Sequence, residues 1–207
     1  MIPFEAASAS TRCGGIYFVR HCRTEWNDAT RLQGGQDVEL SAVGRAQAKA
    51  LGERVRGLGI KVLVTSTLMR AHETASIIGE RCNGRLVTCA DLGEIRFGDM
   101  EGLTLEECEA MYPDTLKLWR QAPQSVRFPN GEAVRDFEKR IMAGLCLTLG
   151  LLSEPALFVL HGGVLRMAKC LLEQLPVSSM NTFAIGNGEL YRLQAMGEGV
   201  EMVPCVG

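Results

Sequence analysis

Two of the three histidines in this chain occupy similar settings in the sequence. His21 follows the mostly apolar run 16–20, and His161 follows the apolar run 156–160. Each run is typical of a buried strand, so each imidazole is expected at the carboxyl end of a strand. Open α/β sheets bind their ligands at that end of the strands. The sequence therefore predicts a ligand site that contains two imidazoles.

Two arginines indicate the kind of ligand. Arg20 directly precedes His21, and Arg70 follows a third short apolar run at 62–64. A guanidinium group binds two oxygens of a phosphate as a fork. Neighbouring arginines lower the pKa of a histidine from about 6.5, which favours the neutral ring. Because a neutral ring can attack phosphorus through the nitrogen that holds its lone pair, the residues indicate a phosphate site with histidine as the nucleophile.

The elements that must position these residues alternate between strand and helix patterns. Connections long enough to hold a helix are typical of parallel strands, so we predict an α/β fold with three layers, α/β/α, around a mostly parallel sheet. In the first long helix, Val43 is expected on the buried face with Leu51 and Val55. Strands are expected at 16–20, 61–65, 85–89, 156–160 and 189–194, and helices after Ser41, after Ser66 or Thr67, from Asn130 to Leu152 and from Gly163 to Leu175, with two short helical patterns between 103 and 129.

The length of 207 residues suits one domain. We expect a flexible, polar tail at 1–14 and a single domain at 15–207, with a helical insertion at about 92–129. A net charge of −2 gives no general attraction for nucleic acid. No apolar run reaches the roughly 20 residues that span a bilayer, so we expect no membrane partner.

The eight cysteines are scattered, and none forms a Cys-x-x-Cys pair. This pattern is typical of free thiols in a reducing compartment, so we expect a cytoplasmic protein. The chain also lacks His-x-x-x-His spacing, which argues against a zinc site.

The first histidine lies in a recognisable motif. The segment Arg20-His21-Cys22-Arg23-Thr24-Glu25-Trp26-Asn27 resembles the Arg-His-Gly-Glu-Thr-x-x-Asn signature of the histidine phosphatase superfamily, which has the phosphoglycerate mutase-like fold. Further blocks resemble that family in the same order, from residue 16 to about 193. They are Leu32-Gln33-Gly34, Leu40-Ser41-x-x-Gly44-x-x-Gln47-Ala48, Ser66-x-Leu68-x-Arg70-Ala71-x-x-Thr74-Ala75, Leu92-x-Glu94-x-x-Phe97-Gly98-x-x-Glu101-Gly102 and His161-Gly162-Gly163.

The resemblance implies a role for each matching residue. His21 would be the nucleophile and would carry a transient phosphoryl group. Glu94 would protonate the leaving alkoxide and then deprotonate the attacking water. No metal or other cofactor is implied. The phosphoryl oxygens would be held by Arg20, Asn27, Arg70 and His161, and the mouth of the site would be lined by Gln33 and Gly34.

The choice of acid depends on the family pattern. From the residues alone, Glu94 cannot be separated from Asp91, Asp99 or Glu101, and most carboxylates of such a segment are expected to be solvated. Another branch of the family has an acidic residue directly after its second histidine. Gly162 occupies that position here, which also favours the loop carboxylate.

Two positions depart from the family pattern. Cys22 replaces a glycine, and a glycine tolerates backbone conformations that cysteine does not. Arg23 replaces a Glu or Gln and adds a cation that would favour a second acidic group on the substrate. The sequence His-Cys also raises the alternative of a thiol nucleophile, but in cysteine-dependent phosphatases an arginine lies where this chain has Asp28.

The predicted function is hydrolysis of a small phosphate monoester through a phosphohistidine intermediate. The first alternative is phosphoryl transfer of the phosphoglycerate mutase type. The second is a phosphate-binding protein with weakened catalysis, because Cys22 and Arg23 depart from the pattern. The expected partner is a small phosphorylated metabolite, and a homodimer is compatible with the fold.

Overall fold

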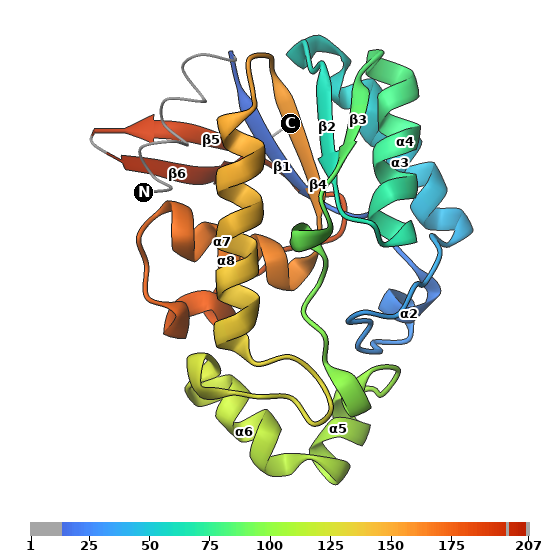
Figure 1. Ribbon diagram of the computed structural model, residues 1–207. Coiled ribbons are helices and arrows are strands. Elements are labelled where there is room, and N and C mark those ends of the chain that lie inside the picture. The colour runs from blue at the N-terminus through green and yellow to red at the C-terminus, as the bar shows by residue number, and fades with distance from the viewer. Residues whose placement is uncertain (1–13, 198, 206–207) are drawn as a thin grey trace.

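A computed structural model describes residues 14–197 and 199–205, so the expected tail lies outside the described residues except for Gly14. Six strands form one sheet in the order β3-β2-β4-β1-β5-β6 (Figure 1). The strands β1, β2, β3 and β4 are parallel to one another. At one edge of the sheet, β5 pairs antiparallel with β1, and β6 pairs antiparallel with β5. The strands are β1 (Ile16–Arg20), β2 (Val62–Thr65), β3 (Arg85–Thr88), β4 (Ala156–Leu160), β5 (Leu190–Met196) and β6 (Gly199–Pro204).

Helices cover both faces of the sheet, because side chains alternate between the two faces along each strand. Ile16 and Phe18 of β1 belong to the core that α7 (Val134–Gly150) and α8 (Gly162–Leu172) complete. Tyr17 and Val19 belong to a second core on the opposite face, which is completed by α3 (Ala42–Val55) and α4 (Met69–Cys82). The predicted three-layer fold with a mostly parallel sheet is confirmed.

The register between β1 and β4 places the carboxyl ends of these two strands at the same height in the sheet. β1 and β4 are parallel neighbours, and Arg20 lies opposite Leu160. The backbone N–H of His21 donates to the carbonyl of Leu160 at 2.8 Å, so the pairing continues one residue beyond β1. The next residue after each strand is a histidine, which explains why the sheet brings the two together.

Three short helices lie at the same end of the molecule (Figure 1). They are α2 (Glu25–Asp28), α5 (Leu105–Met111) and α6 (Pro113–Gln121), and the last two confirm the predicted pair of short helices. Thr104 caps α5, and Pro113 begins α6, where its missing N–H has no consequence. The short 3-10 segments are Arg56–Leu58, Ala90–Leu92, Gly98–Met100, Pro123–Ser125 and Val177–Thr182.

Three predictions about these elements were wrong. Val43 is 61% exposed, because α3 instead buries a face that includes Gly44. A Cβ atom at Gly44 would lie 2.0 Å from the carbonyl oxygen of Arg23, so only glycine allows this contact. The helix expected from Asn130 begins at Val134, since Asn130 is in the left-handed conformation of a turn. The edge strand β6 was missed, because its apolar pattern is short and weak.

In the part of the chain that the structure describes, we find no helix with both the length and the apolar character needed to cross a bilayer.

Candidate active site

The two strand-end histidines lie side by side. The centroids of the His21 and His161 rings are 5.3 Å apart, and the ring planes are tilted by 58°. Both side chains are buried, with exposed fractions of 2% and 0%. The predicted meeting of the two imidazoles at one edge of the sheet is therefore observed.

His21 is held in one tautomer by its neighbour. Its Nδ1 lies 2.8 Å from the carbonyl oxygen of Cys22. A carbonyl oxygen can only accept, so Nδ1 carries the proton and Nε2 holds the lone pair of the neutral ring. Burial, and next the positive charges of Arg70 and Arg20, hold the pKa of His21 well below 6.5. Both effects maintain a neutral imidazole with a nucleophilic Nε2.

His161 has a different environment. Its Nε2 lies 2.7 Å from the Ser66 hydroxyl, and its Nδ1 is buried without a hydrogen-bond partner in the described ranges. Burial, and next the charge of Arg70, hold its pKa well below 6.5. Ser66 or Thr67 was expected to cap the helix that follows β2. The cap position is instead Leu68, whose side chain makes no capping bond, while Ser66 orients His161.

Arg70 is a buried cation and Arg20 a half-buried one, and neither has an acidic partner among the described residues. Neither forms an ion pair with a carboxylate within residues 14–197 and 199–205, and the Nε atom of each is buried without a partner. Backbone carbonyls hold the guanidinium groups: Arg20 donates to Ile185 at 2.9 Å, and Arg70 donates to Gly34 and Gln36 at 2.8 and 2.7 Å. Burial lowers the pKa of Arg70 to about 10. Because unpaired buried charge is costly, this arrangement suits an anionic ligand.

The Glu94 carboxylate contacts the start of α8. Its Oε2 accepts from the backbone N–H of Gly163 at 3.1 Å, and its Oε1 accepts from the N–H of Ile95 at 3.0 Å. Arg140 on α7 fixes the Glu94 backbone, because its Nη2 donates to the Glu94 carbonyl at 2.9 Å. No pattern in the sequence indicates this role for Arg140.

Glu101 is not the solvated carboxylate that the sequence suggested for most acids of this segment. Its Oε1 accepts from the N–H of Gly35 at 2.8 Å and from that of Phe97 at 3.0 Å. A Cβ atom at Gly34, where φ is +52°, would lie 2.1 Å from this oxygen. Glu101 thus fixes the loop whose carbonyls hold Arg70, while Gln33 and Gly34 line the pocket as predicted.

Two asparagines complete the polar side of the site. Asn27 Oδ1 accepts from the N–H of Thr24 at 3.1 Å and from Asn187 Nδ2 at 3.3 Å. These bonds leave the Asn27 amide hydrogens as donors for a ligand. Asn187 also donates to the His21 carbonyl at 2.8 Å, and the sequence analysis missed it because it lies in the irregular segment before β5.

The two departures from the family pattern have local explanations. Cys22 is fully buried beside Leu40 and Ala48, and it is absent from the residues with positive φ, so its backbone conformation does not require glycine. Burial raises the pKa of its thiol to about 12, which argues against a thiolate nucleophile. Arg23 donates through Nε to Asp28 at 2.8 Å, so its charge already has an acidic partner.

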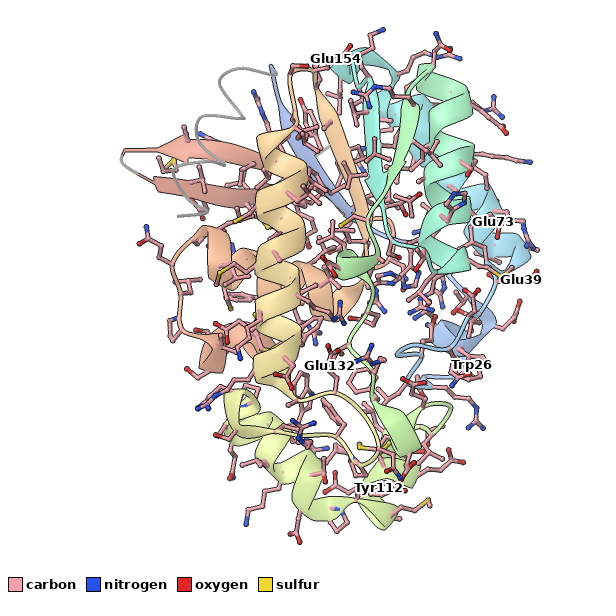
Figure 2. The ribbon with its side chains drawn as sticks, in the orientation of Figure 1. Trp26, Glu39, Glu73, Tyr112, Glu132 and Glu154 are labelled. Atoms are coloured by element: carbon pink, nitrogen blue, oxygen red, sulfur yellow. The ribbon has the colours of Figure 1, made fainter. Side chains whose placement is uncertain are left out.

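A cavity of about 690 Å³ lies beside these groups, and His161 is not among its lining residues. From the site described above, those that line it include Arg20, His21, Asn27, Arg70, Glu94 and Asn187. Its walls come from the carboxyl end of β1, from α8, from α2 and the loop at 31–34, and from the segment that contains α5 and α6. Figure 2 shows that Trp26 of α2 lies on the side of that helix toward this segment. Among the described residues, no cluster of His, Cys, Asp or Glu could hold a metal ion.

Comparisons with family models, curated sequences and solved structures point to the same family. The model of the histidine phosphatase superfamily (branch 1) matches residues 16–205. A relative from Yersinia enterocolitica, named a probable phosphoglycerate mutase GpmB, is 33% identical over 180 residues, which is 86% of this chain and 83% of the relative.

Solved structures agree over nearly the whole chain. Bacillus stearothermophilus YhfR has a TM-score of 0.83 at 28% identity, with 92% of this chain and 95% of that chain covered. A mycobacterial glucosyl-3-phosphoglycerate phosphatase in complex with VO3 has a TM-score of 0.79 at 28% identity, with 93% and 98% covered. The names of these proteins include both a mutase and a phosphatase.

Proposed function

Because the chain belongs to the histidine phosphatase superfamily, branch 1, we propose that it hydrolyses monoesters of phosphate through a phosphohistidine on His21. The substrate is a small phosphorylated metabolite, and the reaction uses no metal ion. The observation that carries this proposal is the bond from His21 Nδ1 to the Cys22 carbonyl. It leaves Nε2 with the lone pair, in a cavity that Arg20 and Arg70 also line.

In the first step, His21 Nε2 forms a bond to phosphorus, and the ester P–O bond breaks. The electron pair of that bond leaves with the alkoxide oxygen, which takes a proton from the Glu94 carboxyl group. Arg20, Arg70, His161 and the Asn27 amide hold the phosphoryl oxygens and stabilise their charge. The unpaired Nε–H groups of the two arginines supply donors for this purpose.

In the second step, water attacks the phosphohistidine. Glu94, now a carboxylate, takes a proton from the water as its oxygen bonds to phosphorus. The P–N bond breaks, and its electron pair returns to His21 Nε2. Inorganic phosphate leaves, and both residues regain their initial states.

Mutase activity is the second candidate, favoured by the name of the Yersinia relative. A mutase must also bind the carboxylate of a phosphoglycerate or the second phosphate of a bisphosphate. Three other cations that line the cavity already have acidic partners: Arg23 with Asp28, Arg31 with Glu107 and Arg120 with Glu109. This pairing favours hydrolysis over phosphoryl transfer between positions of one substrate.

The test measures free phosphate, isomer production and the phosphoenzyme in parallel. We expect phosphate release from phosphate monoesters, inhibition by vanadate, and a phosphoenzyme that is labile in acid and stable in base. His21→Ala should lose at least about a thousandfold in kcat. Conversion of 3-phosphoglycerate to its isomer without phosphate release would favour the mutase, and absence of both activities would favour a binding protein.

A further inference from the structure

The cavity is far larger than a phosphate group needs. The residues that line it beyond the phosphate-sized space around His21, Arg20 and Arg70 indicate which alcohol portion of the substrate it accepts. We infer that the substrate is a phosphate monoester whose alcohol portion carries an aromatic or other bulky apolar ring. This inference rests on the proposed function, because it places the phosphate between Arg20, Arg70 and His21.

Aromatic side chains form the wall of the cavity away from the histidines. The rings of Phe97 and Phe128 are 4.9 Å apart at 84°, and those of Trp119 and Phe128 are 5.3 Å apart at 61°. Edge-to-face packing holds each ring in a fixed orientation. All three residues line the cavity, so together they form a rigid apolar surface that is present before a ligand binds.

Aliphatic and indole groups extend this surface on the helices around it. Leu105 on α5 lines the cavity while 53% of it is exposed, and Leu116 on α6 lines it from a buried position. Trp26 on α2 also lines it. We call these residues the apolar wall: Trp26, Phe97, Leu105, Leu116, Trp119 and Phe128. Burial of apolar surface is favourable in proportion to its area, so this wall binds an apolar group best.

Charge in the outer cavity does not favour a second anionic group. Arg23, Arg31 and Arg120 line the cavity, and each is paired with a carboxylate. Arg166, the remaining cation, is close enough to Arg20 to lower the pKa of that guanidinium, and its Nε donates to the Phe183 carbonyl at 2.9 Å. It therefore adds positive charge near the phosphate rather than at the apolar wall.

Two buried acceptors give the outer cavity a limited polar character. Asn181 donates through Nδ2 to the Trp119 carbonyl at 2.6 Å, which fixes its Oδ1 as an acceptor. That oxygen and Gln33 Oε1 are both buried without a partner in the described part of the chain. A hydroxyl or N–H group on the alcohol portion would satisfy them. The volume of about 690 Å³ lies within the roughly 300–1,000 Å³ of pockets that hold ligands of drug size.

The first experiment measures binding without catalysis. Phosphonates carry a P–C bond that the proposed steps cannot hydrolyse, so their Kd reports the pocket alone. We expect 4-phenylbutylphosphonate to bind at least about tenfold more tightly than 3-hydroxypropylphosphonate, since the phenyl group buries apolar area. Equal or tighter binding of the hydroxypropyl compound would overturn the inference.

The second experiment compares turnover. 3-Phenylpropyl phosphate and 3-phosphoglycerate both release a primary alkoxide. A difference in kcat/KM therefore reflects how the enzyme binds the remainder of each alcohol portion. We expect kcat/KM to be at least about tenfold higher for the phenylpropyl ester. The reverse preference would overturn the inference while leaving the proposed function intact. Tighter binding of the phenyl phosphonate with no turnover of any ester would refute the function and support the pocket assignment.

Variants test the wall itself. Leu105→Asp places a charge at an exposed position in the first turn of α5, and Val43→Asp is its matched control at an exposed position in the first turn of α3. Leu105→Asp should remove the phenyl preference, and Val43→Asp should retain it. Trp119→Ala should act like Leu105→Asp. A phenyl preference that survives both wall substitutions would contradict the inference.

Discussion

Glu94 and Gly163 form one hydrogen-bonded unit, although 69 positions separate them in the sequence. The Glu94 carboxylate accepts from the Gly163 N–H at 3.1 Å. A Cβ atom at position 163 would lie 2.5 Å from Glu94 Oε1, closer than any side chain allows. Gly163 therefore gives the carboxylate both a donor and the space it occupies.

Gly163→Ala should displace the Glu94 carboxylate and leave Arg20 and Arg70 in place. We expect kcat to fall by about 10- to 100-fold, as when a general acid is displaced, with little change in KM. Steady-state kinetics on a phosphate monoester measures this split. Gly162→Ala is the matched control, because its Cβ would contact Arg20 at an ordinary 3.4 Å. A smaller effect at 163 than at 162 would show that the carboxylate is not positioned in this way.

Acidification should destabilise the protein through its two buried histidines. Their pKa values are well below 6.5 in the folded chain, while the unfolded chain takes up protons near pH 6.5. Below that pH the unfolded state binds more protons, so stability is full above pH 6.5 and is lost as the pH falls. Each histidine should remove up to about 1.4 kcal/mol per pH unit in this range.

Urea unfolding at pH 7, 6 and 5 measures this dependence. His21→Asn and His161→Asn should each make the free energy of unfolding less sensitive to pH. His72→Asn removes the exposed third histidine and should leave the dependence unchanged. The assignment fails if the three variants and the wild type show the same slope.

Cys22→Ser should retain catalysis, because the thiol is buried with a pKa of about 12 and is not the nucleophile. We expect kcat within about threefold of the wild type and a loss of stability of about 1–3 kcal/mol from the buried hydroxyl. Activity assays and thermal unfolding measure the two effects. Near-total loss of activity in a folded Cys22→Ser protein would revive the thiol mechanism.

Arg140→Met should both destabilise the protein and slow the reaction. Glu132, which is 4% exposed and lies near the start of α7 (Figure 2), accepts from Arg140 Nε at 2.7 Å and from its Nη2 at 2.9 Å. Removing the guanidinium leaves a buried carboxylate and releases the Glu94 backbone. The free energy of unfolding should fall by about 3 kcal/mol or more.

Two controls accompany this substitution. Arg127→Met breaks a pair with Asp136 in which both side chains are exposed, and it should change stability by less than about 1 kcal/mol. Adding Glu132→Gln to Arg140→Met should restore part of the lost stability, because the double variant no longer buries a carboxylate that has lost Arg140 and keeps only the distant Arg96 guanidinium, at 3.9 Å, as a cationic partner in the described ranges. A double variant less stable than Arg140→Met alone would refute this account.

The sequence alone determined the two strands that directly precede His21 and His161, the three-layer fold and the family. These features depend on the local periodicity of apolar residues and on short motifs, and both can be recognised in consecutive residues of the sequence. The buried face of α7 was also predictable, because large apolar residues recur there at helical spacing.

Only the tertiary structure decided the contacts between distant segments. The register of β1 and β4 levels the two histidines, Arg140 on α7 holds the Glu94 backbone, and Asn187 reaches the His21 carbonyl. The identity of the apolar wall was also hidden, because its rings come from separate segments whose patterns are broken. Such contacts have no period in the sequence, since they arise from how elements pack after each has formed.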